Sequence, residues 1–311
     1  MTRKKGIEGR TLRERLKKVD YRLFFMALPF VIFIFMFNYA MLFGWIYAFV
    51  DFMPSKPIFQ QDFVGLKHFI ALFSYGSRFP LALKNTFIFG ALGILVSPVP
   101  LLVAVLLSEL PWRKFSRAVQ TITSFPNFIS WVLAFSLAFM FFSVEGKITQ
   151  ILIDLGLQKE GYNLLGDPNA VYWFQTLLGL WKGTGWTAII YLSAIAGIDQ
   201  ELYYSAAIDG ANRLQTIWHI TIKSILPTFF VLLVLNISGL VSAGFDQYWV
   251  FMNTLTIDKL EVLSTYAYRI GIGRAQISQG TAIGIMQSLM STVLLFTVNR
   301  LAKRITGNLV F

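Results

Sequence analysis

Six long apolar runs limit what this chain can fold into. Each is long enough, or nearly so, to cross the roughly 30 Å of hydrocarbon in a bilayer as a helix. They cover residues 23–50, 85–108, 125–142, 171–197, 225–245 and 279–299. Because lipid supplies no hydrogen bonds to the backbone, a spanning segment must be helical, and no ten-residue alternation suggests a barrel. The sequence therefore predicts an all-α integral membrane protein with six transmembrane helices.

The distribution of Lys and Arg predicts the orientation of these spans. Of the 27 basic residues, 17 lie in four segments with 77 residues in total: 1–22, 109–124, 198–224 and 300–311. The remaining three loops hold nine basic residues in 95 residues: 51–84, 143–170 and 246–278. Since cytoplasmic loops carry the excess of positive charge, we expect both termini in the cytoplasm and the loops 51–84, 143–170 and 246–278 outside.

This orientation divides the chain into three parts. We expect a basic cytoplasmic segment at 1–22, a six-helix membrane domain at 23–299 with a long cytoplasmic loop at 198–224, and a cytoplasmic tail at 300–311. The first segment is then a topology signal that lies against anionic lipid. The net charge of +11 consequently does not indicate a nucleic-acid surface.

Several kinds of chemistry have no support in the sequence. The chain has no cysteine, and its two histidines, His68 and His219, lack the spacing of metal ligands. It also lacks the phosphate-binding Gly-x4-Gly-Lys-Ser/Thr loop, so any energy from ATP must come through a partner. We therefore expect neither a catalytic site nor a metal site on this chain.

The cytoplasmic loop at 198–224 contains signals for two helices. Asp199 can cap a helix that runs to Ile208 and ends at Gly210. Asn212 can cap a second helix, with Gln215 reaching back in a capping box. Asp209 can also accept backbone N–H bonds at the start of this helix and hold the corner. In that second helix, one apolar face is expected to carry Leu214, Ile217, Trp218, Ile222 and Ile225. A plain amphipathic hairpin on the lipid headgroups would give the same pattern.

The residues Ala206-Ala207-Ile208-Asp209-Gly210-Ala211, with nine residues between Gly210 and Ile220, resemble the EAA loop of ATP-binding-cassette importer permeases. Three other segments are similar to the branch that takes up oligosaccharides and polysaccharide fragments: SFPNFISWVL at 124–133, WKGTGWTAIIYLSAIAGID at 181–199 and GFDQYW at 244–249. The resemblance extends from about residue 20 nearly to the end of the chain. It implies the six-helix fold of a type I importer permease.

This resemblance assigns the loop to coupling, as a rigid helical plug seated in a cytoplasmic ATPase. The implied ATPase-coupling residues are Tyr204, Ser205, Ala206, Ala207, Asp209, Gly210, Ala211 and Ile220. Tyr204 stands where the family usually has Glu, and Ile222-Lys223 stand in place of the usual Leu-Pro. We therefore expect docking without the salt bridge that a carboxylate would form.

The same resemblance implies a multi-subunit importer in a bacterial cytoplasmic membrane. Its other subunits would be a second, similar permease, two cytoplasmic ATPases and an extracytoplasmic solute-binding protein. Any ATP and Mg²⁺ would bind to the ATPase subunits, and this chain would hold no cofactor. The transported molecule would be a saccharide.

Polar and aromatic side chains within or near the spans are candidates for the transport pathway, since lipid-facing positions disfavour polar groups. Sugars stack their C–H faces on aromatic rings and bond their hydroxyls to amide or charged groups. The candidates are Trp45, Trp131, Trp181, Lys182, Trp186, Tyr191, Asn236, Asp246, Gln247 and Trp249. Aromatic belts at the membrane interface and a snorkelling Lys182 would also fit this pattern.

Small-residue pairs suggest close helix packing, and we interpret Gly179 with Gly183, and Gly280 with Gly284, in that sense alone.

Three other classes of membrane protein are the alternatives: a secondary transporter, a membrane enzyme and a non-transporting scaffold. A secondary transporter would normally carry ionisable carboxylates within its spans, as would a membrane enzyme, and the interiors of these six spans contain no Asp or Glu. A non-transporting scaffold stays open.

Overall fold

The computed structural model describes residues 21–157, 161–241 and 244–306. In this part the chain is helical apart from one short antiparallel ribbon that pairs Val50 with Phe63. Its elements are α2 (Tyr21–Ile34), η1 (Phe35–Tyr39), η2 (Ala40–Phe49), β1 (Val50–Asp51), η3 (Ile58–Gln60), β2 (Asp62–Phe63), α3 (Lys67–Ala71), α4 (Phe79–Val96), α5 (Pro98–Ser108), α6 (Arg113–Ser124), η4 (Phe125–Phe128), α7 (Trp131–Phe142), α8 (Lys147–Asp154), η5 (Leu164–Gly166), α9 (Val171–Ala196), α10 (Gln200–Ile208), α11 (Arg213–Thr216), η6 (Ile217–Ile222), α12 (Lys223–Gly239), α13 (Phe245–Phe251), α14 (Ile257–Leu260), α15 (Leu263–Tyr268), η7 (Arg269–Gly273) and α16 (Ile277–Thr306). The predicted all-α fold is confirmed.

Five helical segments of the described chain are long and apolar enough to cross a membrane: Phe24–Phe49, Phe79–Ser108, Trp131–Asp154, Arg213–Gly239 and Ile277–Arg300. The fourth predicted span appears as α9, which matches its predicted bounds within one residue. At 1.5 Å per residue, its 26 residues extend about 39 Å, enough to cross the hydrocarbon. Its polar residues, Lys182 among them, make it less apolar than the other spans.

The third predicted span is not one continuous helix. Residues 113–124, which we expected in a cytoplasmic loop, form α6, and α6 packs against α5 and α9. The chain then breaks at Phe125–Ser130 before α7 begins at Trp131. The break arises because the proline at 126 cannot donate a backbone hydrogen bond and Ser130 caps the new helix by accepting from the backbone N–H of Leu133.

Other helix ends also differ from the predicted boundaries. The second span starts six residues early, at Phe79, and a turn at Ser97 separates α4 from the proline-containing start of α5. The fifth span ends at Gly239, and α16 continues into the expected C-terminal tail as far as Thr306. The basic N-terminal segment lies almost entirely outside the described residues.

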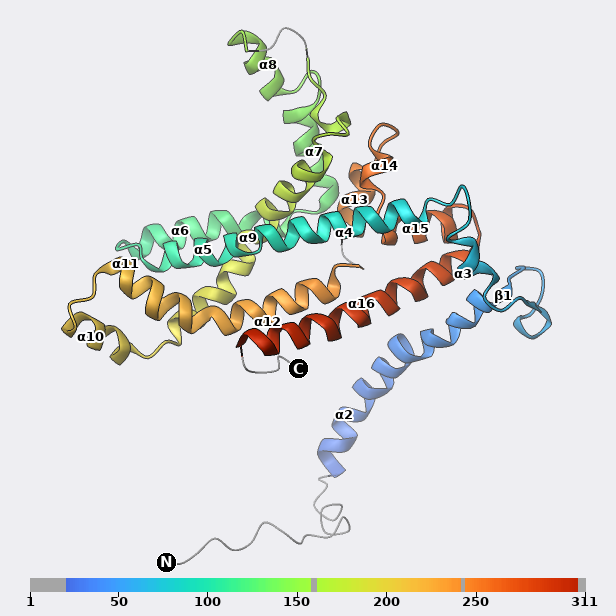
Figure 1. Ribbon diagram of the computed structural model, residues 1–311, viewed down its shortest axis with the longest axis horizontal. Helices are drawn as coiled ribbons and strands as arrows, with labels where there is room; N and C mark the ends of the chain where they lie inside the picture. The colour runs from blue at the N-terminus through green and yellow to red at the C-terminus, as the bar shows by residue number, and fades with distance from the viewer. Residues whose placement is uncertain (1–20, 158–160, 242–243, 307–311) are drawn as a thin grey trace, which may run out of the picture.

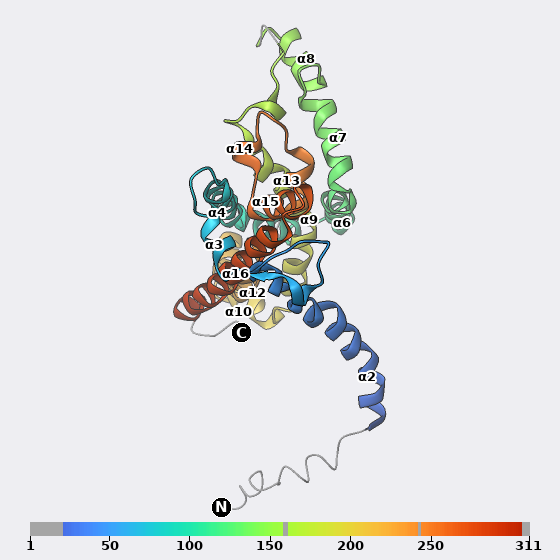
Figure 2. The same cartoon turned by 90° about the vertical axis from the view of Figure 1, so that its right-hand side faces the viewer.

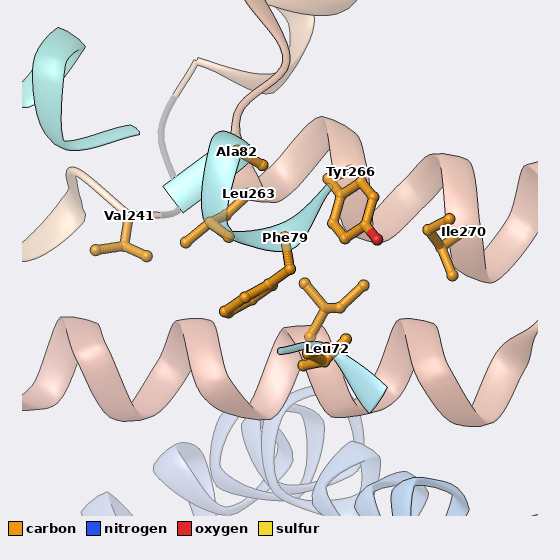
Figure 3. Packing of buried hydrophobic residues seen from close by; sticks show 8 residues of the cluster. Leu72, Phe79, Ala82, Val241, Leu263, Tyr266 and Ile270 are labelled. Carbon is orange, nitrogen blue, oxygen red and sulfur yellow. The ribbon is translucent and has the colours of Figure 1, made fainter. Parts of the chain in front are cut away.

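The core of the bundle lies between α4, α15 and α16. Figure 3 shows the cluster in which Phe79 of α4 packs between Leu72, Leu263 and Tyr266. Each of these four side chains is at most 3 % exposed. Helix α16 also lies very close to η7: a Cβ atom at Gly280 would lie 2.5 Å from the Cα of Gly271. Gly280 therefore serves in packing, as predicted, whereas a Cβ atom at Gly284 would meet no atom within 4 Å, so the prediction for Gly284 is wrong.

A buried polar network ties α4 to the segment that holds α14, α15 and η7. The carboxylate of Glu261, 1 % exposed, accepts from Nε of Arg78 at 3.0 Å and from Nε of Arg269 at 2.5 Å. The side-chain amide of Asn85 donates to the carbonyl oxygens of Asp258 and Glu261. The network joins the start of α4 to α14, α15 and η7.

Two parts extend away from the other described helices (Figures 1 and 2). One is α2 with η1 and η2, in which the most apolar window of Phe24–Phe49 has no buried residue. The other is the unit formed by α7 and α8. The loop between α9 and α12 lies at one end of the bundle, while β1 and α3 lie at the other (Figure 1).

Candidate functional site

A cavity of about 300 Å³ opens among α4, α5, α9, α12 and α13. Its wall contains no charged side chain among the described residues. The polar side chains that line it belong to Thr86, Ser97, Gln175, Thr176, Thr184, Thr187, Tyr191, Asn236, Gln247 and Tyr248. Aromatic and aliphatic groups such as Phe89, Phe229 and Leu233 complete the wall. A ligand there would meet hydroxyl and amide groups beside apolar surface, the usual chemistry of a site for a polar, uncharged molecule.

Glycines give the cavity its width. A Cβ atom built at Gly93 or Gly183 would meet no atom within 4 Å, and one at Gly179 would lie 3.6 Å from Oε1 of Gln247. All three glycines line the cavity. The interpretation of Gly179 and Gly183 as packing residues only is therefore wrong, because both line the cavity, and open space rather than a neighbouring helix faces Gly183.

Two buried glutamines bridge α9 and α13 at this cavity. Nε2 of Gln247 donates to the backbone oxygen of Gln175 at 2.8 Å and to its Oε1 at 2.9 Å. Their exposed fractions are 7 % and 4 %. Gly244, with φ of +81°, allows the sharp turn that starts α13 and brings Gln247 inward. Gln175 was missed by the sequence interpretation, although a glutamine inside an apolar span was a usable signal.

The structure brings together three of the ten predicted pathway residues: Tyr191, Asn236 and Gln247 line the cavity. The other seven do not line it: Trp45, Trp131, Trp181, Lys182, Trp186, Asp246 and Trp249. Asp246 and Trp249 are exposed on α13, and the ring of Trp249 stacks on Phe245. Trp45 and Trp181 are 40 % and 44 % exposed, as interfacial or lipid-facing aromatic rings would be.

Lys182 has a structural role that the sequence did not reveal. Its Nζ donates to the carbonyl oxygens of Pro126 at 3.2 Å and Asn127 at 2.8 Å, and it lies 5.4 Å from the ring centroid of Trp131. The side chain is therefore turned toward the break between α6 and α7. It neither lines the cavity nor snorkels, because these carbonyls and the aromatic face partner the cation inside the protein.

Trp186 lies on the same side of α9. Its ring meets Phe128 edge-to-face at 5.9 Å. Nearby, α9 approaches the end of α6 so closely that a Cβ atom at Gly185 would lie 2.1 Å from the carbonyl oxygen of Thr123. Trp131, Lys182 and Trp186 thus belong to one contact region around residues 123–131.

After the C-terminal end of α9, the loop at 198–224 has the two predicted caps. The Asp199 side chain accepts from the backbone N–H of Glu201, which starts α10. At its far end, the N–H groups of Gly210 and Ala211 donate to the carbonyl oxygens of Ala207 and Ala206. This is a Schellman motif, and Gly210 has the positive φ, +72°, that such a motif requires.

The second helix begins with the predicted capping box. Asn212 accepts from the N–H of Gln215, whose side chain accepts from the N–H of Asn212. This helix is not a separate short one, because α11, η6 and α12 continue as one helix from Arg213 to Gly239. The expectation that Asp209 caps it is wrong: in the described chain its carboxylate accepts no hydrogen bond, and Asn212 holds the corner.

The loop exposes several apolar side chains. Tyr203 packs inward, with its hydroxyl 3.0 Å from Oγ1 of Thr221. Tyr203 and the half-buried Ile220 both pack against a buried hydrophobic cluster that includes Tyr191 and Ile225. The outward-facing residues include four large apolar ones that are between 63 % and 86 % exposed: Tyr204, Ile208, Leu214 and Trp218. Leu214 and Trp218 are exposed, whereas Ile225 is fully buried. Ser205 and Ala207 are exposed, while Ala206 and Ala211 are half-buried.

No group of three or more His, Cys, Asp or Glu side chains among the described residues is arranged to hold a metal ion. His219 bonds the backbone oxygen of Gln215 within its own helix, and His68 lies 3.4 Å from Asp51.

Comparisons with known proteins agree on one family. Residues 97–307 match the family described as "Binding-protein-dependent transport system inner membrane component". Two relatives come from Bacillus subtilis (strain 168). The polygalacturonan/rhamnogalacturonan transport system permease protein YteP is 38 % identical over 91 % of this chain and 88 % of its own length. Protein LplB is 33 % identical over 98 % and 94 %.

The structural comparison gives the same result. The chain is similar to one in the crystal structure of a bacterial alginate ABC transporter in complex with alginate pentasaccharide-bound periplasmic protein, with a TM-score of 0.86. The identity is 32 %, and the match covers 96 % of this chain and 99 % of the other. The protein thus belongs to the inner-membrane permease subunits of binding-protein-dependent ATP-binding-cassette importers.

Proposed function

We propose that this permease carries an oligosaccharide or a polysaccharide fragment and that the cavity is part of its path. The observation that carries the proposal is the combination of neutral polar side chains, aromatic rings and a glycine-lined opening in one cavity. Saccharide hydroxyls pair with amide and hydroxyl groups, while sugar C–H faces pack on aromatic rings. The names of the relatives, which concern polygalacturonan, rhamnogalacturonan and alginate transport, support the same substrate class.

The cavity would recognise the hydroxyl groups of the saccharide rather than carboxylates. No Arg or Lys side chain among the described residues lines the cavity: Lys182 binds backbone carbonyls, and Arg269 binds Glu261. Lys259 lies 3.4 Å from Oδ1 of Asn169, outside the cavity. Any recognition of a uronic-acid group would accordingly rest on another subunit or on the binding protein.

A second permease would complete the pathway. The segment from α2 to η2 presents an apolar surface that this chain does not cover, and it joins the bundle mainly where η2 packs on α16. A neighbouring membrane subunit beside this segment would bury that surface. Lipid would cover whatever remains.

The coupling loop at 198–224 would seat in a cytoplasmic ATPase. Two features support this role: the outward apolar side chains Tyr204, Ile208 and Leu214, and the rigid corner fixed by the Schellman motif and the capping box. Two ATPase subunits would then bind ATP and Mg²⁺, one against each permease. Because Tyr204 replaces a carboxylate, the contact would be mainly apolar.

The coupling loop would lie in the cytoplasm, and the extracytoplasmic binding protein would dock at the opposite end. The excess of Lys and Arg in segments 1–22, 109–124, 198–224 and 300–311 supports this orientation. Since the chain has no cysteine, single cysteines at Ser74 and Asn212, both exposed, can test it. An impermeant thiol reagent applied to intact cells should label position 74 alone, and labelling at 212 alone would reverse the orientation.

The transport proposal is tested by reconstitution. The chain, a companion permease, two ATPase subunits and a binding protein are placed in liposomes and given a panel of neutral and acidic saccharides. Saccharide uptake that depends on ATP and on the binding protein supports the proposal. Uptake by the purified chain alone, without ATPase, would instead favour a secondary transporter.

A further inference from the structure

Three helices that line the cavity meet at the coupling loop, and each is connected to it differently. Helix α9 enters the loop directly at Gly197, and α12 leaves it as part of the continuous helix that starts at Arg213. Helix α5 ends far from the loop in sequence, at Ser108. Its connection to the loop is made by side chains.

The connection is an ion pair between Arg213 and Glu109. Nε of Arg213 lies 2.6 Å from Oε2 of Glu109, and a terminal nitrogen of the same guanidinium donates to the backbone oxygen of Glu109. Glu109 is the C-terminal cap of α5, so its backbone oxygen lacks a partner within the helix. One guanidinium thus binds both the carboxylate and the exposed end of α5, where a positive charge also suits the helix dipole.

Both ends of this contact lead to the cavity wall. Pro100 in α5 lines the cavity, as do Leu233 and Asn236 in α12. Among the ion pairs between described residues, the one with Arg213 is the one that involves the coupling loop. Arg213 is also the first residue after the cap Asn212, so its backbone belongs to the rigid corner.

We propose that Arg213 is a positioning residue that makes the end of α5 move together with the start of α12 when the ATPase displaces the coupling loop. This inference rests on the proposed coupling function. The pair is partly exposed, 65 % for Arg213 and 27 % for Glu109, so it is not needed to hold the fold together. Its role is to link α5 and α12, two walls of the cavity that the backbone does not join directly.

The test uses the full complex in liposomes and measures saccharide uptake per ATP hydrolysed. Arg213→Gln and Glu109→Gln should each lower this ratio by about three-fold, the factor equivalent to about 0.7 kcal/mol for a partly exposed pair. Both variants should still copurify with the ATPase. The reversed pair, Arg213→Glu with Glu109→Arg, should restore the ratio, because Glu at a helix start and Arg at a helix end both suit the dipoles.

The outcomes separate this inference from the function on which it rests. An unchanged ratio in both single variants overturns the inference, and so does a reversed pair that restores nothing, since Arg213 would then act on another group. A wild-type complex whose ATP hydrolysis is not tied to uptake contradicts the proposed function itself. Lys67→Gln is the matched control: it breaks an ion pair of 2.7 Å with Asp51 at the other end of the bundle and should leave the ratio unchanged.

Discussion

The ammonium nitrogen of Lys182 donates to the carbonyl oxygen of Asn127 at 2.8 Å, across the break between α6 and α7. A charged group in a membrane span usually marks a substrate or ion pathway. Here the cation instead donates to backbone carbonyls at the break between two helices, and one of these, that of Pro126, also accepts from the backbone N–H of Ile129. The charge therefore stabilises a corner of the structure, and the cavity among α4, α5, α9, α12 and α13 is lined by neutral groups.

Lys182→Met should destabilise the protein without changing its affinity for substrate. The substitution leaves the carbonyl of Asn127 without its donor, which costs about 1–3 kcal/mol, while the carbonyl of Pro126 keeps the backbone N–H of Ile129. We expect a lower thermal midpoint in detergent and an unchanged apparent KM for uptake. Lys84→Met, at an exposed position of α4, is the control and should change neither quantity. A several-fold higher KM with normal stability would return Lys182 to the pathway.

Gly183→Val should block transport while the protein still assembles. No atom lies within 4 Å of the added Cβ, so the side chain fills the cavity instead of disturbing a neighbouring helix. We expect uptake to fall at least about ten-fold, the usual effect of a steric misfit in a binding pocket. Gly284→Val on α16 also meets no neighbour and does not line the cavity, so it should transport normally. Equal loss in both variants would contradict the assignment.

Gly210→Val should uncouple ATP hydrolysis from uptake or release the ATPase. The added Cβ would meet no neighbour, but a φ of +72° strains any residue with a side chain by about 1–2 kcal/mol. Relief of that strain would turn α10 relative to α11. Uptake, ATPase activity and copurification are measured on the same preparation. Gly76→Val, with φ of +84° and open space at the other end of the bundle, carries the same strain and should remain coupled.

Glu261→Gln should be among the most destabilising single changes outside the transport cavity. It removes the buried charge that holds both Arg78 and Arg269, and breaking a buried ion pair costs about 3–5 kcal/mol. The measurement is the thermal midpoint of the purified protein. Asp258→Asn affects the other partner of Arg78, but this carboxylate is 72 % exposed, so the expected shift is small. Similar shifts in the two variants would show that Glu261 does not organise this region.

Local features could be predicted from the sequence because they depend on neighbouring residues. Asp199, Gly210 and Asn212 define the ends of their helices through bonds that span two to five residues, and these caps appear as expected. The lengths of the apolar runs determined the membrane class and most spans. The break at Phe125–Ser130 and the extra helix α6 were missed because α6 is amphipathic and carries three basic residues at its start.

The site itself was decided by tertiary structure. Whether Gly183 faces a neighbouring helix or open space depends on how α4, α5 and α12 surround α9, and no local pattern encodes that arrangement. Likewise, Lys182 bonds to acceptors 55 and 56 residues away in the sequence, and Arg213 pairs with Glu109 across 104 residues. The sequence by itself determined the membrane class and the helix caps of the loop at 198–224, because hydrophobic length and short-range bonds act within one segment. The roles of individual polar residues depended on contacts between distant segments, which only the packed fold creates.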